Sequence, residues 1–167
     1  MKILFACNEN SCRSQIAEAL AKNISQGKIE FYSAGSKPSG VVNPMAIKLL
    51  RAQGVDLSDH KSKHVSNFEG IKIDYLILMG CGDKCPNLVA DERIEWDIPD
   101  PKDMEKSEFL KVIEKIRCEV QKLIGTIYIE YSLWRVLLQI LHPSISYHVQ
   151  FLVSSILKLS LLLPVQQ

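Results

Sequence analysis

The chain has 167 residues, with 20 Lys and Arg against 19 Asp and Glu, and therefore a formal charge of +1. This length suits one globular domain, and the near-zero charge argues against a protein that coats nucleic acid, because that function needs a basic excess or a basic face. The apolar stretch that follows Lys2 ends at Cys7 and is too short for a signal peptide. We therefore expect a cytoplasmic protein whose five cysteines are catalytic, metal-binding or buried rather than a disulfide framework.

The first part of the chain alternates strand and helix patterns. Short apolar runs predict strands over residues 3–6, 30–34, 74–79 and, more weakly, 93–96. Apolar residues at helical spacing predict helices from residue 13 to Gly27, from Pro44 to Gly54 and over 109–123. Strands separated by helices indicate an α/β fold, with a small parallel four-stranded sheet and helices on both faces.

The composition changes near Gly125. Residues 126–167 contain three of the 39 charged side chains and no Gly, Ala or Asp, whereas all eight glycines lie at or before Gly125. We therefore predict two parts, a domain of residues 1–125 and an apolar C-terminal tail of residues 126–167. Three interpretations of the tail remain open: a membrane contact, which its Lys158 and polar residues disfavour, an oligomerisation hairpin, and a sequence not selected for folding, such as a frameshift product.

Chemically active side chains follow three of the predicted strands. Residues 7–14 follow the first strand, residues 81–85 the third and residues 97–100 the fourth. In parallel sheets, ligands bind beyond the carboxyl ends of the strands. The three segments therefore predict one active site at this edge of the sheet.

The first segment has a thiol, five residues, an arginine and a helix start. Loop amides and the helix N-terminus would bind an anion, and the guanidinium of Arg13 would grip a tetrahedral oxyanion. The same positive field would favour the thiolate of Cys7, which makes it a nucleophile, and Ser14 could donate a hydrogen bond to it. The expected oxyanion cradle comprises Asn8, Glu9, Asn10, Ser11, Cys12 and Arg13.

These residues resemble the low-molecular-weight tyrosine phosphatases and the arsenate reductases that share their fold. Both branches have the Cys-(five residues)-Arg-Ser signature, and the run N-S-C-R-S-Q-I-A-E over residues 10–18 is similar to the reductase branch. Further similarities are Y-S-A-G over 32–35, N-P over 43–44, G-V-D-L-S over 54–58 and D-P over 100–101. The resemblance extends from Met1 to about Ile124.

The resemblance implies that Asp100 handles protons. In the phosphatases the corresponding Asp protonates the leaving group, and in the reductases it assists proton transfer near the second cysteine. Asp97, three positions earlier, is the competing candidate for this role. The alternative interpretation of Asp97 is that it belongs to a solvated acidic loop.

The second segment, G-C-G-D-K-C-P over residues 80–86, distinguishes the two branches. Reducing arsenate consumes two thiols, whereas a phosphatase needs one. By resemblance, Cys7 attacks arsenate, Cys81 attacks the adduct, and Cys85 resolves the Cys7–Cys81 disulfide. Only three residues separate Cys81 from Cys85, fewer than in the thioredoxin-coupled members, so their loop must deform to bring the sulfurs together. The pair could be half a zinc site, but no second pair with ligand spacing accompanies it, so we predict no metal.

Some relatives bind potassium beside the loop through residues that match Asn10, Glu18 and Ser33, together with an Asp. Lys63 stands at the corresponding Asp position, and its ammonium could replace the cation. We therefore expect no dependence on potassium.

The sequence predicts a thiol-dependent arsenate reductase with no bound cofactor, regenerated by thioredoxin, glutaredoxin or a low-molecular-weight thiol. The alternative enzyme is a tyrosine phosphatase that uses Cys7, Arg13 and Asp100 alone. A further alternative, of another class, is a non-catalytic anion-binding or redox-sensing module.

Overall fold

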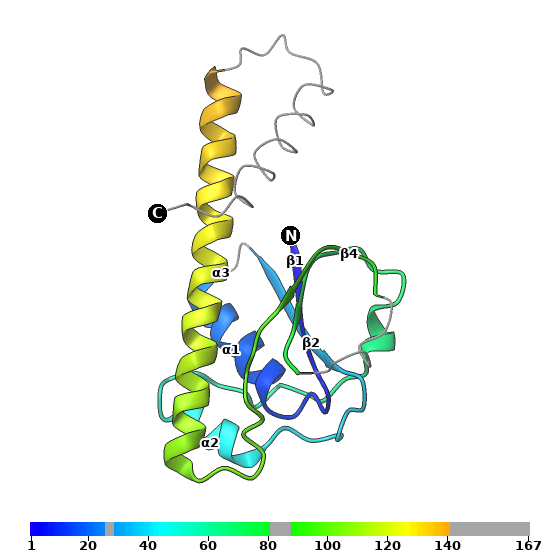
Figure 1. Ribbon diagram of the computed structural model, residues 1–167, viewed down its shortest axis with the longest axis vertical. Coiled ribbons are helices and arrows are strands. Elements are labelled where there is room, and N and C mark those ends of the chain that lie inside the picture. The colour runs from blue at the N-terminus through cyan, green and yellow to red at the C-terminus, as the bar shows by residue number, and fades with distance from the viewer. Residues whose placement is uncertain (26–28, 81–87, 141–167) are drawn as a thin grey trace. The chain divides into compact units, whose positions relative to one another are not determined.

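The computed structural model describes residues 1–25, 29–80 and 88–140. Its elements are β1 (Lys2–Cys7), α1 (Arg13–Ser25), β2 (Glu30–Gly35), α2 (Pro44–Arg51), the 3₁₀ helix η1 (Val65–Phe68), β3 (Ile73–Leu78), β4 (Ala90–Glu95) and α3 (Lys106–Ile140). The four strands form one sheet in the order β2-β1-β3-β4, and all neighbours are parallel. The predicted α/β class with a four-stranded parallel sheet is confirmed (Figure 1).

β1 lies at the centre of the sheet because its residues can be buried on both faces. Every residue from Ile3 to Cys7 is buried, which is typical of an inner parallel strand. β4 is an edge strand in which half-buried and exposed residues alternate. Its charged Asp91, Glu92 and Arg93 weaken the apolar signal, so the sequence predicted only residues 93–96.

The two faces of the sheet are covered differently among the described residues. Leu4, Ala6 and Leu76 share a buried cluster with Val65 and Phe68 of η1, an element that the sequence did not predict. Ile3 and Phe5 alternate with Leu4 and Ala6 along β1 and therefore point to the other face. α1 lies beside β1 and β2 (Figure 1).

Local caps explain where α2 begins. The side-chain oxygen of Asn43 accepts hydrogen bonds from the amides of Met45 at 2.8 Å and Ala46 at 3.3 Å, and Pro44 occupies the first helical position. The helix ends at Arg51, and the chain turns through Gly54 at a φ of 77°, where the sequence predicted the helix to end.

The chain divides into two compact units, Met1–Ile124 and Gly125–Gln167. α3 belongs to both, because it continues through Gly125 to Ile140, beyond the predicted span of 109–123. In the first unit its buried stripe is Phe109, Val112, Ile113, Ile116, Val120 and Leu123. Within the part of the chain that the structure describes, no helix combines the length and the apolar character needed to cross a membrane.

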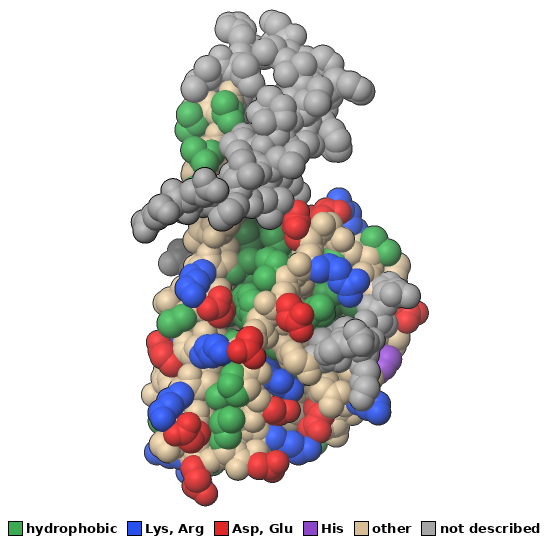
Figure 2. All heavy atoms as spheres, viewed as in Figure 1, with side chains coloured by type: hydrophobic (Ala, Val, Ile, Leu, Met, Phe, Trp, Pro, Cys, Tyr) green, Lys and Arg blue, Asp and Glu red, His purple; other side chains and the backbone are tan. Residues whose placement is uncertain are grey.

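Positive and negative side chains are mixed on the surface of the first unit. On the face shown in Figure 2, Lys and Arg alternate with Asp and Glu, in keeping with a net charge of +1. Attraction for an anion must therefore come from a local arrangement of donors.

Candidate active site

The loop of residues 7–14, called the anion loop below, follows β1 and leads into α1. The backbone carbonyls of Cys7, Asn8, Glu9 and Ser11 accept hydrogen bonds from the amides of Ser36, Lys37, Ser39 and Asn43, at 2.8–3.2 Å. In a trans peptide unit the C=O and the N–H point in opposite directions. The N–H groups of these four peptide units therefore point away from the donors in residues 36–43. This arrangement suits an anion-binding loop.

Asn10 and Gly35 make the conformation of the anion loop possible. Asn10 is fully buried at a φ of 47°, a conformation that asparagine tolerates better than most residues. At Gly35, the last residue of β2, a Cβ atom would lie 2.6 Å from the oxygen of Asn8 and 2.8 Å from the nitrogen of Asn10. Only glycine lets the loop pass so close to β2. The sequence motif contained Gly35, but its packing role was not predicted.

The sulfur of Cys7 lies 3.0 Å from the hydroxyl oxygen of Ser14, and both residues are buried. The direction of this hydrogen bond follows from its neighbours. The backbone amide of Lys63 donates to Asn10 Oδ1 at 2.7 Å, so the amide nitrogen of Asn10 must be the group that donates to Ser14 Oγ at 2.8 Å. The hydroxyl hydrogen of Ser14 is then free to point at Cys7, which is the geometry that the predicted hydrogen bond requires.

Arg13 and Asp100 lie side by side. Arg13 Nη2 donates to Asp100 Oδ2 at 2.8 Å, and Nη1 donates to the carbonyl of Ile98 at 3.3 Å. Asp97, in contrast, is exposed and pairs with Lys115 at 3.6 Å. Of the two candidate acids, the structure places Asp100 beside the predicted oxyanion ligand.

Gly80 makes room for Arg13. Its φ is 66°, and a Cβ atom there would lie 2.5 Å from Arg13 Nη1. The sequence predicted that the loop after Gly80 deforms, but it did not predict this contact with Arg13. A glycine directly after a predicted strand on the active edge was the signal that could have identified this contact.

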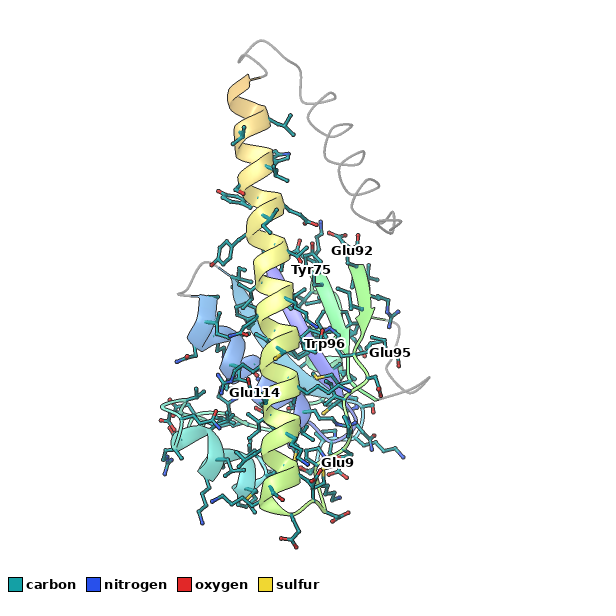
Figure 3. All side chains as sticks on the ribbon, turned by 60° about the vertical axis from the view of Figure 1, so that its left-hand side comes forward. Glu9, Tyr75, Glu92, Glu95, Trp96 and Glu114 are labelled. Carbon is teal, nitrogen blue, oxygen red and sulfur yellow. The ribbon has the colours of Figure 1, made fainter. Side chains whose placement is uncertain are left out.

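A small pocket opens between the anion loop and the segment after β4. It is lined by Cys7, Glu9, Ser11, Cys12, Arg13, Asp100 and Lys102. Lys102 was not predicted; its Nζ donates to Glu9 Oε1 at 2.8 Å, and this bond raises the pKa of Lys102. Figure 3 shows Glu9 beyond the carboxyl ends of the strands, at the opposite end of the sheet from Glu92.

Cys12 lines the same pocket in a different environment. Burial, followed by the charges of Asp100 and Cys7, raises the pKa of its thiol to about 12. Cys12 therefore lines the pocket as a neutral thiol at neutral pH.

A buried polar network supports the anion loop from behind. Gln15 is fully buried, and its amide nitrogen donates to Asn10 Oδ1 at 2.9 Å and to the carbonyl of Lys61 at 2.9 Å. Its amide oxygen lies 2.8 Å from His60 Nδ1. The sequence did not predict the roles of Gln15 and His60, because no local spacing pattern relates residues that lie 45 positions apart.

The residues beside the loop do not fit a potassium ion. Glu18 is buried, and its carboxylate lies 2.5 Å from Lys22 Nζ and 3.7 Å from Lys63 Nζ. Glu18 Oε2 and Ser33 Oγ are buried without a hydrogen-bond partner in the described part of the chain. Two ammonium groups already neutralise the carboxylate, and they would repel a further cation.

The three other cysteines of the chain are Cys81, Cys85 and Cys118. Cys81 and Cys85 lie outside the described residues. Cys118 is exposed on α3. Over residues 1–25, 29–80 and 88–140, no group of three or more His, Cys, Asp and Glu side chains could hold a metal ion.

The chain is similar to named proteins over most of its length. Residues 2–132 match the family described as low molecular weight phosphotyrosine protein phosphatase. A glutaredoxin arsenate reductase from Synechocystis sp. is 36% identical over 129 residues, which are 75% of this chain and 98% of that protein.

Two solved structures are also similar. An arsenate reductase in the phosphate binding state has a TM-score of 0.69 and 34% identity, over 75% of this chain and 98% of that one. A thioredoxin-dependent arsenate reductase from Corynebacterium glutamicum has a TM-score of 0.65 and 32% identity, over 77% of this chain and 62% of that one. With the signature loop, the parallel sheet and this match, the chain belongs to the low molecular weight phosphotyrosine protein phosphatase family.

Proposed function

We propose that the protein reduces arsenate to arsenite through a cysteine relay. The observation that carries this proposal is the buried Cys7 sulfur, 3.0 Å from Ser14 Oγ, in a pocket shared with Arg13 and Asp100. Relatives named arsenate reductase support the choice of substrate.

In the first step the oxyanion binds in the anion loop. The loop amides and Arg13 hold its oxygens, which requires the guanidinium to exchange the carboxylate of Asp100 for the ligand. The thiolate of Cys7 then attacks arsenic, and one oxygen leaves as water after it accepts protons, the last of them from Asp100. The product is an arsenate thioester of Cys7 in which arsenic is still pentavalent.

The second step transfers the electrons. The thiolate of Cys81 attacks the Cys7 sulfur, a Cys7–Cys81 disulfide forms, and the electron pair of the sulfur–arsenic bond stays on arsenic, which leaves as arsenite. Cys85 then attacks Cys81 and releases Cys7 as a thiolate. Two thiols are oxidised and one arsenic is reduced by two electrons.

The Cys81–Cys85 disulfide must be reduced by an external thiol. A thioredoxin or a glutaredoxin is the class of partner that the named relatives favour, and a low-molecular-weight thiol has the same chemistry. We propose that the reaction takes place in the cytoplasm, where such reductants keep thiols reduced.

A phosphatase is the second candidate, because phosphate and arsenate share shape and charge. The pocket would then use Cys7 as nucleophile and Asp100 as acid, with no need for Cys81 or Cys85. A non-catalytic anion-binding or redox-sensing module is the third candidate.

One assay distinguishes the three candidates. The purified protein is given arsenate or p-nitrophenyl phosphate, with and without a thiol-reducing system, and the assay is repeated with Cys81→Ser and with Cys118→Ser. Reductant-dependent arsenite release that Cys81→Ser abolishes and Cys118→Ser preserves supports the relay. Hydrolysis of p-nitrophenyl phosphate that survives Cys81→Ser, without arsenite release, supports the phosphatase. Anion binding without either reaction supports the third candidate, the non-catalytic module.

A further inference from the structure

The amide of Gln15 is fully buried, has four polar contacts and is not used by the proposed mechanism. We propose that Gln15, oriented by His60, is a positioning residue that keeps the Ser14 hydroxyl directed at the Cys7 thiolate and thereby sets the reactivity of Cys7. The inference names a residue for the reaction proposed above, but its main readout, the reactivity of Cys7, does not depend on the identity of the substrate.

The contacts of Gln15 fix which end of its amide is nitrogen. One end lies against three acceptors: Asn10 Oδ1 at 2.9 Å, the carbonyl of Asn10 at 3.2 Å and the carbonyl of Lys61 at 2.9 Å. Backbone carbonyls only accept hydrogen bonds, so this end must be the NH₂ group. The other end, the amide oxygen, therefore needs a donor.

His60 supplies that donor. Its Nδ1 lies 2.8 Å from Gln15 Oε1, so Nδ1 must carry a hydrogen. The ring keeps this hydrogen in both its neutral and its charged form. The charged groups that act on the ring are Glu18, at 4.0 Å, and Lys22, Lys63 and Asp59, and the role proposed for His60 requires none of them to titrate.

The network reaches the reacting sulfur in three hydrogen bonds. Gln15 and the Lys63 amide both donate to Asn10 Oδ1, which turns the Asn10 nitrogen toward Ser14 at 2.8 Å. Ser14 Oγ accepts that bond, so its own hydrogen is left for Cys7 at 3.0 Å. Without Gln15, Asn10 loses one of the two donors that hold its oxygen, and Ser14 can turn its hydrogen elsewhere. The thiolate would then lose a donor, which favours its protonated form.

The same bonds restrain the backbone of Asn10. A φ of 47° is sparsely populated for residues other than glycine, and the Gln15 nitrogen also contacts the Asn10 carbonyl at 3.2 Å. Gln15 therefore holds both the side chain and the backbone of the residue at which the anion loop turns.

The test measures how fast iodoacetamide alkylates Cys7 as a function of pH, with the peptide that contains Cys7 followed by mass spectrometry. His60→Leu removes the donor, and the midpoint of alkylation is expected to rise by about one pH unit. His60→Gln keeps an N–H donor and is expected to stay within about 0.3 pH unit of the wild type. Gln15→Met removes the amide at similar length and is expected to shift the midpoint at least as far as His60→Leu.

His64→Leu is the matched control. His64 is exposed, and among the described residues its ring bonds to Ser66 alone, so its loss removes the cap of η1 without touching the anion loop. Its midpoint is expected to match the wild type even if the protein is less stable. Should Gln15→Met fail to fold, the two His60 variants decide the question.

A folded His60→Leu protein with the wild-type midpoint would overturn the inference, as would equal shifts in His60→Leu and His64→Leu. In the arsenate assay, His60→Leu is expected to lower kcat about tenfold at neutral pH and to leave KM within about twofold. If the wild type releases no arsenite but the alkylation shifts appear, the proposed function fails and the positioning role stands.

Discussion

Cys7 and Cys12 both belong to the anion loop, yet the two thiols lie in different surroundings. Cys7 faces a hydroxyl donor from Ser14, whereas Cys12 is buried near the negative charges of Asp100 and Cys7. A thiolate is the reactive form of cysteine, so the raised pKa of Cys12 disfavours this residue as the nucleophile.

Iodoacetamide is therefore expected to modify Cys7 and leave Cys12 intact at about pH 8. The pKa of Cys12 is raised to about 12, so its thiolate becomes abundant only well above neutral pH. Peptide mass spectrometry of the two positions checks the order. Modification of Cys12 at a rate similar to Cys7 would contradict this assignment.

Gly80 gives a second prediction at the level of a single residue. Gly80→Ala is expected to weaken the binding of inorganic phosphate by about tenfold, because the new methyl group displaces the Arg13 guanidinium. Calorimetric titration measures the affinity.

Gly70→Ala provides the control for backbone strain. Gly70 has a φ of 75°, and apart from its two chain neighbours no described residue has an atom within 4 Å of the position that a Cβ would take there. Both variants therefore bear a left-handed strain of about 1–2 kcal/mol, but only Gly80→Ala disturbs Arg13. Equal losses of phosphate affinity in the two variants would argue against a specific role of Gly80.

At the scale of elements, the segment of residues 60–63 supports the anion loop and also brings a cation to Glu18. The backbone amide of Lys63 bonds to Asn10, and its ammonium lies 3.7 Å from Glu18 Oε2. The element thus contributes both a structural donor and a counter-charge for a buried carboxylate.

Activity is accordingly expected to be the same, within about twofold, in potassium and in sodium at equal ionic strength. The reason is that Lys63 and Lys22 already neutralise Glu18. Initial rates of arsenite release in the two salts check this. Lys63→Met removes one ammonium group. If the rate of this variant then rises with potassium, the result would support the idea that the Lys63 ammonium takes the place of a potassium ion. A strong potassium stimulation of the wild type would refute it.

The anion loop was the most predictable element, and β4 and η1 were the least. The loop follows a strongly apolar central strand. Its cysteine, arginine and serine are the residue types that attack on a bound oxyanion would need, so they are recognisable in the sequence. β4 alternates charged residues at a sheet edge, and η1 is a single short turn whose Val65 and Phe68 are buried only through tertiary contacts. Such elements have weak local patterns because the fold, not the segment, determines their burial.

At the scale of the whole molecule, the change of composition near Gly125 does not coincide with the end of a helix. α3 runs through Gly125 to Ile140, and the family match reaches residue 132. Membrane contact, oligomerisation and an unselected sequence all stay open for residues 126–167. Ile129, Tyr131, Leu133 and Val136 are exposed on the described part of this region.

Truncation after Ser132 is expected to leave kcat/KM for arsenate within about twofold of the full chain, since every described site residue lies in the unit Met1–Ile124. Truncation after Glu114 is the contrasting variant. It removes Ile116, Val120 and Leu123, three buried residues, and is expected to abolish the thermal unfolding transition. Loss of activity in the first variant, with an intact transition, would assign a functional role to the tail.

The sequence by itself predicted the class of fold and the family correctly, and it proposed Cys7 as nucleophile and Arg13 as oxyanion ligand, because each depends on a local pattern: apolar runs, helical spacing, and a cysteine and an arginine on one short loop. Only the tertiary structure decided that Asp100 rather than Asp97 pairs with Arg13, that Gly35 and Gly80 make room for the loop and the guanidinium, and that Gln15 and His60 support Asn10. These contacts join residues 25 to 87 positions apart, except for Gln15 and Asn10. Their distances depend on the packing of separate elements, which no local pattern records.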